Sequence, residues 1–113
     1  MSEEKVVLEI PLPKDDGIYE YNDTLIVKGE EFIQKVASAL SSLTRIKILK
    51  FVREKPVNIA EIANIISQSK ANASTQIRIL ENVKLLKPWY EPGIKGIRKK
   101  AESNIKKVLL ILE

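Results

Sequence analysis

Two helical patterns separated by only two residues place the strongest constraint on the fold. Apolar side chains recur at the spacing of one helical face in residues 59–66, and again in residues 69–83. Ser67 and Gln68 lie between the two patterns, which predicts a tight turn, and Ser69 can cap the start of the second helix. Two short helices with so small a connection are typical of a helix-turn-helix.

The second helix has one apolar face and one polar face. Ala73, Ile77 and Leu80 fall at the i, i+4 and i+7 positions of one stripe, which we expect to be buried. The remaining surface is rich in side chains that can donate to phosphates and read base edges: Lys70, Asn72, Ser74, Thr75, Gln76 and Arg78. A face that only meets water more often alternates Glu with Lys, whereas Glu81 is the only acid here. The composition therefore favours DNA recognition.

A basic hairpin is predicted directly after this helix. Residues 87–90 read as a strand, residues 91–96 as a turn rich in Pro and Gly, and residues 97–102 as the returning strand. The basic side chains of the tip and the return limb are Lys95, Arg98, Lys99 and Lys100. Such a charge run can simply protect an edge strand from pairing. Behind a helix-turn-helix, however, it is typical of a wing that grips phosphates.

Two more helices are expected upstream. The first begins after Gly29, and its buried stripe consists of Phe32, Val36 and Leu40, flanked by Ile33 and Ala37. The second covers about residues 43–53, with an inward set of Leu43, Ile46, Leu49 and Val52. Its outward set is Lys47, Lys50 and Arg53. Asn58 and Glu61 resemble a capping box at the start of the third helix.

The charge is divided unevenly along the chain. Residues 1–31 hold nine acids and three lysines, and the whole chain has a formal charge of +4, so the remainder carries +10. Residues 1–28 are expected to form an acidic arm of extended pieces, at 6–13, 18–21 and 24–27. A body at +10 attracts polyanions, with nucleic acid as the first candidate and an anionic membrane surface as the second.

The absence of Cys and His excludes many functions. Without these residues the chain cannot form disulfides, thiolate or imidazole catalytic sites, or the common zinc sites, so we expect no enzyme activity, metal or cofactor. Apolar runs are too short for a membrane span or a signal peptide, and we expect a cytoplasmic protein. Abundant Ile and Lys without Cys or His are typical of thermophiles.

The C-terminal strand predicts association. Residues 105–112 end in five consecutive apolar residues, which are too few to cross a membrane and are apolar on both faces. Such a strand must be covered, either by the N-terminal strand or by a second subunit. We therefore expect a homodimer.

Three blocks of the sequence can be compared with known families: residues 39–49 (ALSSLTRIKIL), residues 59–63 (IAEIA) and residues 74–80 (STQIRIL). Together they resemble the ArsR-like winged-helix transcriptional regulators of bacteria and archaea, over a region of about residues 32–101. Gln76 stands where the family often has His, Ser67 where a turn Gly is common, and Lys84 where a Gly usually ends the recognition helix. Because Lys84 disfavours positive φ, we expect that helix to end with another geometry. The metal-sensing members' Cys and His ligands are missing, so the resemblance implies the fold and DNA binding without metal sensing.

These observations predict an α+β, mainly α protein. Residues 1–28 form the N-terminal β-like arm, and residues 29–113 form a winged helix-turn-helix domain with a hairpin wing and a C-terminal strand. The expected function is sequence-specific binding of double-stranded DNA by a homodimeric transcription regulator. Base contacts are expected from Lys70, Asn72, Thr75 and Gln76, with Asn72 and Gln76 able to pair adenine. Phosphate contacts are expected from Ser69, Ser74, Arg78, Lys95, Arg98, Lys99 and Lys100. The alternative is a winged-helix module that binds protein within a larger complex.

Overall fold

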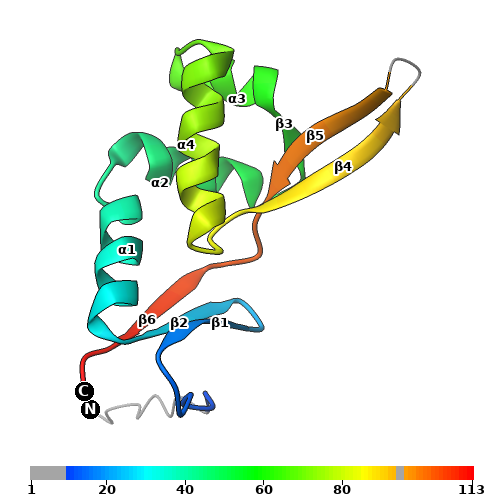
Figure 1. The fold of residues 1–113 in the computed structure, drawn as a ribbon. Coiled ribbons are helices and arrows are strands. Elements are labelled where there is room, and N and C mark those ends of the chain that lie inside the picture. Colours follow the sequence, from blue (N-terminus) through cyan, green and yellow to red (C-terminus); the bar gives the residue numbers. More distant parts are fainter. Residues whose placement is uncertain (1–9, 94–95) are drawn as a thin grey trace, which may run out of the picture.

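The computed structural model describes residues 10–93 and 96–113, which form four helices and two small sheets (Figure 1). The helices are α1 (Glu30–Leu40), α2 (Leu43–Val52), α3 (Ile59–Ile66) and α4 (Lys70–Asn82). The strands are β1 (Gly17–Tyr21), β2 (Thr24–Lys28), β3 (Val57–Asn58), β4 (Lys87–Gly93), β5 (Gly96–Glu102) and β6 (Lys107–Ile111). One sheet has the order β1-β2-β6 and the other β3-β5-β4. The α+β winged helix-turn-helix predicted from the sequence is confirmed.

The predicted stripe of the recognition helix α4 lies in the core. Ala73, Ile77 and Leu80 are all buried, and they pack in the same cluster as Ile62 of α3 and Ile48 of α2. The predicted caps also form. Asn58 Oδ1 accepts a hydrogen bond from the Glu61 backbone N–H at 2.8 Å, and Ser69 Oγ accepts one from the Asn72 N–H at 3.1 Å. Local signals and packing therefore agree on where α3 and α4 begin.

Both helices of the helix-turn-helix end on a residue with positive φ that is not Gly. Ser67 has a φ of 55° and Lys84 a φ of 63°. After α4, the Lys84 N–H donates to Glu81 O at 3.0 Å and the Leu85 N–H donates to Leu80 O at 3.0 Å, which is the Schellman pattern. The expectation that Lys84 would impose another geometry is wrong. Burial of Leu80 and Leu85 within this turn holds Lys84 in the left-handed conformation.

The inward face of α2 also differs from the expected one. Leu43 is 86% exposed, whereas Ile48 and Val52 are buried. Apolar residues occur on several sides of this helix, so the sequence period alone selects no single stripe. In α1, Ala37 is exposed and Ala39 is buried. The buried face of this helix therefore passes from Val36 to Ala39, three residues later, and not to the adjacent Ala37.

The wing is longer than predicted. Glu91, Pro92 and Gly93 belong to β4 and were expected in the turn, and Gly93 pairs with Gly96 across the hairpin. Gly96 has a φ of 116°, a conformation that Gly adopts without strain and that suits a tight reversal. Residues 94–95, including the predicted contact Lys95, lie outside the described residues.

The C-terminal strand β6 lies beside β2 in parallel. Leu25 pairs with Val108, Ile26 with Leu109 and Val27 with Leu110. The strand is therefore covered along one edge by the third extended piece of the N-terminal region, and not by the predicted strand at 6–13, of which residues 6–9 lie outside the described residues.

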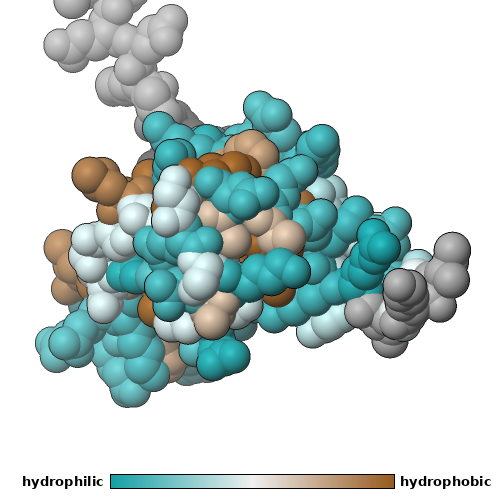
Figure 2. Space-filling model, turned by 90° about the horizontal axis from the view of Figure 1, so that it is seen from above, coloured by the Kyte–Doolittle hydropathy of each residue, from teal (hydrophilic) through white to brown (hydrophobic). Residues whose placement is uncertain are grey.

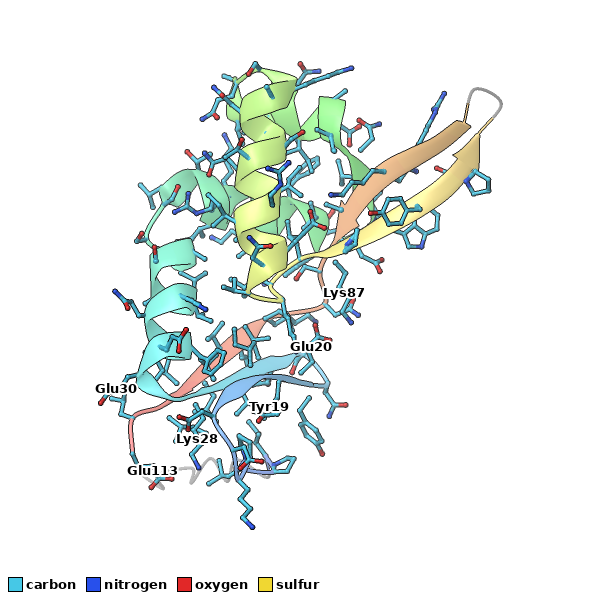
Figure 3. All side chains as sticks on the ribbon, in the orientation of Figure 1. Tyr19, Glu20, Lys28, Glu30, Lys87 and Glu113 are labelled. Carbon is cyan, nitrogen blue, oxygen red and sulfur yellow. The ribbon has the colours of Figure 1, made fainter. Side chains whose placement is uncertain are left out.

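Residues 13–16 are fastened below the β1-β2-β6 sheet by side chains that point away from the helices (Figure 3). Lys28 Nζ donates to Lys14 O at 3.0 Å and to Pro13 O at 3.2 Å, and the Tyr19 hydroxyl donates to Asp15 O at 2.9 Å. The approach is close at Gly29, where φ is 100° and a Cβ would lie 2.6 Å from the Asp16 carboxyl carbon. The turn into α1 therefore requires glycine.

Two lysines join this sheet to the helix-turn-helix. Lys84 Nζ, just after α4, donates to Ile18 O of β1 at 3.0 Å. Lys87, at the base of the wing, lies 2.7 Å from the Glu20 carboxylate (Figure 3). The recognition helix and the wing are therefore anchored to the same strand. In the described part of the chain, every helix is too short or too polar to cross a membrane.

Candidate nucleic-acid interface

The N-terminal end of α4 and the wing project from the same end of the molecule, opposite the β1-β2-β6 sheet (Figure 1). Viewed onto that end, the surface is mainly hydrophilic, and the wing extends to one side of the helices (Figure 2). In a winged helix-turn-helix, the first turns of the second helix enter the major groove. The helix and the wing are therefore arranged to contact one duplex together.

Four predicted contacts lie on the open side of α4. Lys70, Asn72, Thr75 and Arg78 are exposed, while Ala73, Ile77 and Leu80 fill the opposite face. The Thr75 hydroxyl donates to Ala71 O at 3.1 Å, which leaves its oxygen free to accept and its methyl group exposed to a partner. Together the four side chains supply a cationic amine, a guanidinium, a carboxamide and a methyl group, which suit phosphates and base edges.

Ser69 is also exposed, and it has a structural role. Its hydroxyl oxygen accepts from the Asn72 N–H, as the first turn of α4 requires. The hydroxyl hydrogen remains available to a phosphate oxygen, and the helix start brings further N–H groups and a partial positive charge to the same place. Ser69 therefore holds the end of the helix that faces the proposed DNA.

Ser74 and Gln76 are half-buried on opposite flanks of α4. Gln76 lies toward α1 and α2, where its Oε1 accepts a hydrogen bond from Arg45 Nη1 at 2.8 Å. Arg45 Nε also donates to Ala39 O at 2.7 Å, and Nη2 donates to Ser38 O at 3.1 Å. One guanidinium thus binds the last turn of α1 to the recognition helix. Gln76 keeps its two amide hydrogens and one acceptor lone pair for a partner.

The basic residues of the wing divide between its two faces. Successive strand residues point to opposite sides, so Arg98 and Lys100 share one face and Lys99 lies on the other. Lys99 faces α4, where its Nζ lies 2.8 Å from Glu81 Oε1. With only 15% of the Glu81 side chain exposed, this ion pair fixes the middle of the wing against the recognition helix.

Lys100 is held on the outer face of the wing. Its Nζ lies 2.8 Å from Glu91 Oε2 and 5.5 Å from the centre of the Trp89 ring. The hydrogen bond and charge of Lys100, with a smaller contribution from Arg98, lower the pKa of the Glu91 carboxyl. Arg98 is exposed toward the far end of the hairpin. Arg98 and Lys100 therefore share one face of the wing. To contact a phosphate, Lys100 first has to leave Glu91, just as Lys99 has to leave Glu81.

Arg45 and Glu81 hold the candidate contacts Gln76 and Lys99, and neither was singled out from the sequence. Arg45 precedes the buried Ile48 and Val52 by three and seven residues, so it shares their inward face. An inward Arg needs acceptors, and that requirement is a signal for a link between helices. For Glu81 the only signal was its acidity within a polar helix face, which does not identify Lys99 as its partner.

Comparison with known proteins finds one family that this chain resembles. Residues 42–87, from the cap of α2 to the first residue of the wing, match the family model described as bacterial regulatory protein, arsR family. This helix-turn-helix region is therefore similar to the ArsR family, and the match covers less than half of the chain. Among curated proteins, none matches the chain. The likeness to this family therefore lies in the region that contains α2, α3 and α4.

Solved structures share the winged helix-turn-helix fold at low sequence identity. Mb0332 of Mycobacterium bovis, described as a homodimeric winged helix-turn-helix DNA-binding domain, is 19% identical over 66% of this chain with a TM-score of 0.57. The match spans 65% of the length of that Mb0332 chain. Reduced HlyU of Vibrio cholerae is 14% identical over 65% of this chain and 73% of its own, with a TM-score of 0.55. NolR of Sinorhizobium fredii is 19% identical over 65% of this chain and 69% of its own, with a TM-score of 0.53.

Proposed function

We propose that this chain regulates transcription by binding a specific double-stranded DNA site as a homodimer. The observation that supports this most is the arrangement of α4 and the wing. The N-terminal end of α4 projects from the same end of the molecule as the hairpin, and Lys99 and Glu81 hold the two elements together at 2.8 Å. The ArsR-family match covers this helix-turn-helix, and that family is one of regulatory proteins.

The side chains divide into two groups in this proposal. Lys70, Asn72 and Thr75, in the first turns of α4, read base edges in the major groove. Gln76 contributes from the flank, held by Arg45. Phosphates are contacted by Ser69, Ser74 and Arg78 of the helix and by Lys95, Arg98, Lys99 and Lys100 of the wing.

A homodimer accounts for recognition of a two-fold symmetric site. Two copies would place their α4 helices in successive major grooves, about 34 Å apart, on a palindromic duplex. The structural relative Mb0332 is described as homodimeric, which makes this assembly the natural one to test.

A selection from random duplexes, read at two salt concentrations, tests the function. We expect enrichment of a palindromic motif. Raising the salt concentration should lower the affinity for random DNA much more than it lowers the ratio of the affinities for the motif and for random DNA. Recovery of no motif, with no binding to any duplex even at low salt, would contradict the proposal. In that case the chain would act as a winged-helix module that binds protein, an alternative that the exposed Leu43 and Phe51 of α2 favour.

A further inference from the structure

The strand β6 has an apolar edge that nothing in the described residues covers. It is the last strand in the order β1-β2-β6, so β2 pairs with one edge and the other edge has no strand beside it within residues 10–93 and 96–113. Residues 108–112 are all aliphatic. Natural proteins protect free edges with charge, proline or bulges, and a bare aliphatic edge predicts a partner. The opposite edge, β1, has the ion-paired Glu20.

The exposure of β6 is concentrated on the face that bears the helices. Val108 pairs with Leu25 and Leu110 with Val27, and both partners are fully buried in the core beneath the helices. Leu110 lies on the same face but is 40% exposed, and Leu112, the next residue on that face, is 84% exposed. The core therefore continues along β6 to its free edge, where the described residues provide no covering layer.

Two apolar hollows border this edge along α1. A groove of about 170 Å³ is lined by Leu40 of α1, Leu49 of α2 and Val108. At the other end of β6, a second hollow of about 280 Å³ is lined by Ile33, Ile111 and Leu112. An additional strand at the edge of β6 would bring side chains over both hollows, which identifies this side as a docking surface.

The sequence of β6 suits antiparallel pairing with a second copy of the same strand. Lys107 begins the strand, Glu113 follows it, and the five residues between them are aliphatic. With Leu110 opposite Leu110 of a second copy in antiparallel pairing, each Lys107 faces a partner Glu113, and each Val108 faces a partner Leu112. Moving the centre to Leu109 or Ile111 places a charge opposite an aliphatic side chain. Only the register centred on Leu110 matches charge with charge and aliphatic with aliphatic.

We propose that the homodimer forms by antiparallel pairing of β6 with β6 of a second copy, centred on Leu110, to give a continuous six-stranded sheet. This inference rests on the proposed homodimeric function and specifies its interface. The two-fold axis of such a pairing is perpendicular to the sheet, so the helices of both copies lie on the same side. Because α4 points its N-terminal end away from the sheet, both recognition helices face one duplex (Figure 1).

Disulfide trapping tests the register in the full chain, which has no native Cys. In Leu110→Cys, the two thiols lie directly opposite each other, with Cα atoms about 4.5–5.5 Å apart, and mild oxidation should link the dimer. In Leu112→Cys, each thiol is two residues from the axis, so the Cα atoms are separated by roughly 14 Å and cannot be bridged. We expect Leu110→Cys to cross-link at least about 10-fold faster, although exposure alone predicts the reverse order.

A mixed experiment provides the matched control. Val108→Cys and Leu112→Cys should each fail to cross-link alone, yet a mixture of the two variants should form a heterodisulfide, because these positions are opposite in the proposed register. Leu110→Lys, which places two charges together at the axis, should sediment as a monomer with an unchanged far-UV spectrum. Together these results would establish both the interface and its register.

Three outcomes would overturn the inference. If the chain sediments as a dimer while Leu112→Cys cross-links as fast as Leu110→Cys, the homodimer stands and the β6 pairing fails. If the chain sediments as a monomer at micromolar concentration, the pairing fails together with the proposed homodimer. If Leu110→Cys cross-links only after residues 1–9 are deleted, the chain's own N-terminal segment occupies the edge.

Discussion

Arg45 Nη1 donates a hydrogen bond to Gln76 Oε1 at 2.8 Å, and the same guanidinium holds the carbonyl oxygens of Ser38 and Ala39. A single side chain therefore connects the end of α1 to the recognition helix. The site is half-buried, so an acceptor left without a donor there has limited access to water.

Removing the Arg45 guanidinium should destabilise the fold more than removing the Gln76 side chain. Arg45→Ala leaves Ala39 O and Gln76 Oε1 without this donor, whereas Ser38 O still accepts from the Ser41 hydroxyl at 2.6 Å. We expect the variant to lower the free energy of unfolding by about 1–3 kcal/mol. Gln76→Ala removes one of the three bonds and should cost about 1 kcal/mol. Urea denaturation of both variants and of the double variant measures the coupling. Equal losses in the two single variants would show that Arg45 does not hold α1 and α4 together.

Ser67 and Lys84 offer two matched tests of backbone strain. Both have positive φ, where glycine avoids the steric cost of a Cβ. Ser67→Gly should raise the free energy of unfolding by roughly 0.5–1 kcal/mol. Lys84→Gly should raise the free energy of unfolding by less, because this variant also loses the hydrogen bond from Lys84 Nζ to Ile18 O. Thermal unfolding of the two variants compares them directly, and a destabilised Ser67→Gly would contradict the strain argument.

Acid should loosen the contact between β6 and the β1–β2 turn. Desolvation of the Asp23 carboxyl opposes its ionisation, but the charge and hydrogen bond of Lys107 and the hydrogen bond from Thr24 outweigh it, and the pKa falls below 3.8. A lowered pKa in the folded state gives stability that is present above pH 3.8 and lost as the pH falls through the lower, folded value.

Asp23→Asn removes this linkage and tests it. The variant should be less stable than the wild type at pH 7 and should lose less additional stability when the pH is lowered to 3. Glu91→Gln serves as the control, because the Glu91 carboxyl also has a lowered pKa but pairs with Lys100 on the wing, away from β6. If the stability of Asp23→Asn and that of the wild type fall in parallel as the pH is lowered, the Asp23 carboxyl is not the source of this pH dependence.

The winged helix-turn-helix could be predicted because its signals are local. Asn58 and Ser69 cap helices through bonds within three residues, and the stripe of Ala73, Ile77 and Leu80 follows from the helical period. The wing was recognised as a hairpin, but its length was not, because Pro92 is tolerated in an edge strand such as β4.

The errors arose where distant residues decide the structure. Lys84 adopts positive φ because Leu80 and Leu85 are buried around it, and Leu43 is exposed because α2 has apolar residues on several sides. The parallel pairing of β2 with β6 joins residues more than 80 positions apart, beyond the reach of any local pattern. In the candidate site, residue types were predictable, but the partners of Gln76, Lys99 and Lys100 were not.

The central claim, that α4 reads sequence while the wing grips the backbone, is tested most directly by the DNA affinity of Asn72→Ala and Arg98→Ala. Both residues are exposed, and affinity is measured on the selected site and on random DNA over a range of salt. Asn72→Ala should lose about 1–3 kcal/mol on the selected site and little on random DNA. Arg98→Ala should weaken both duplexes alike and reduce the salt slope by about one unit. Unchanged affinity of both variants for both duplexes at low salt would contradict the account.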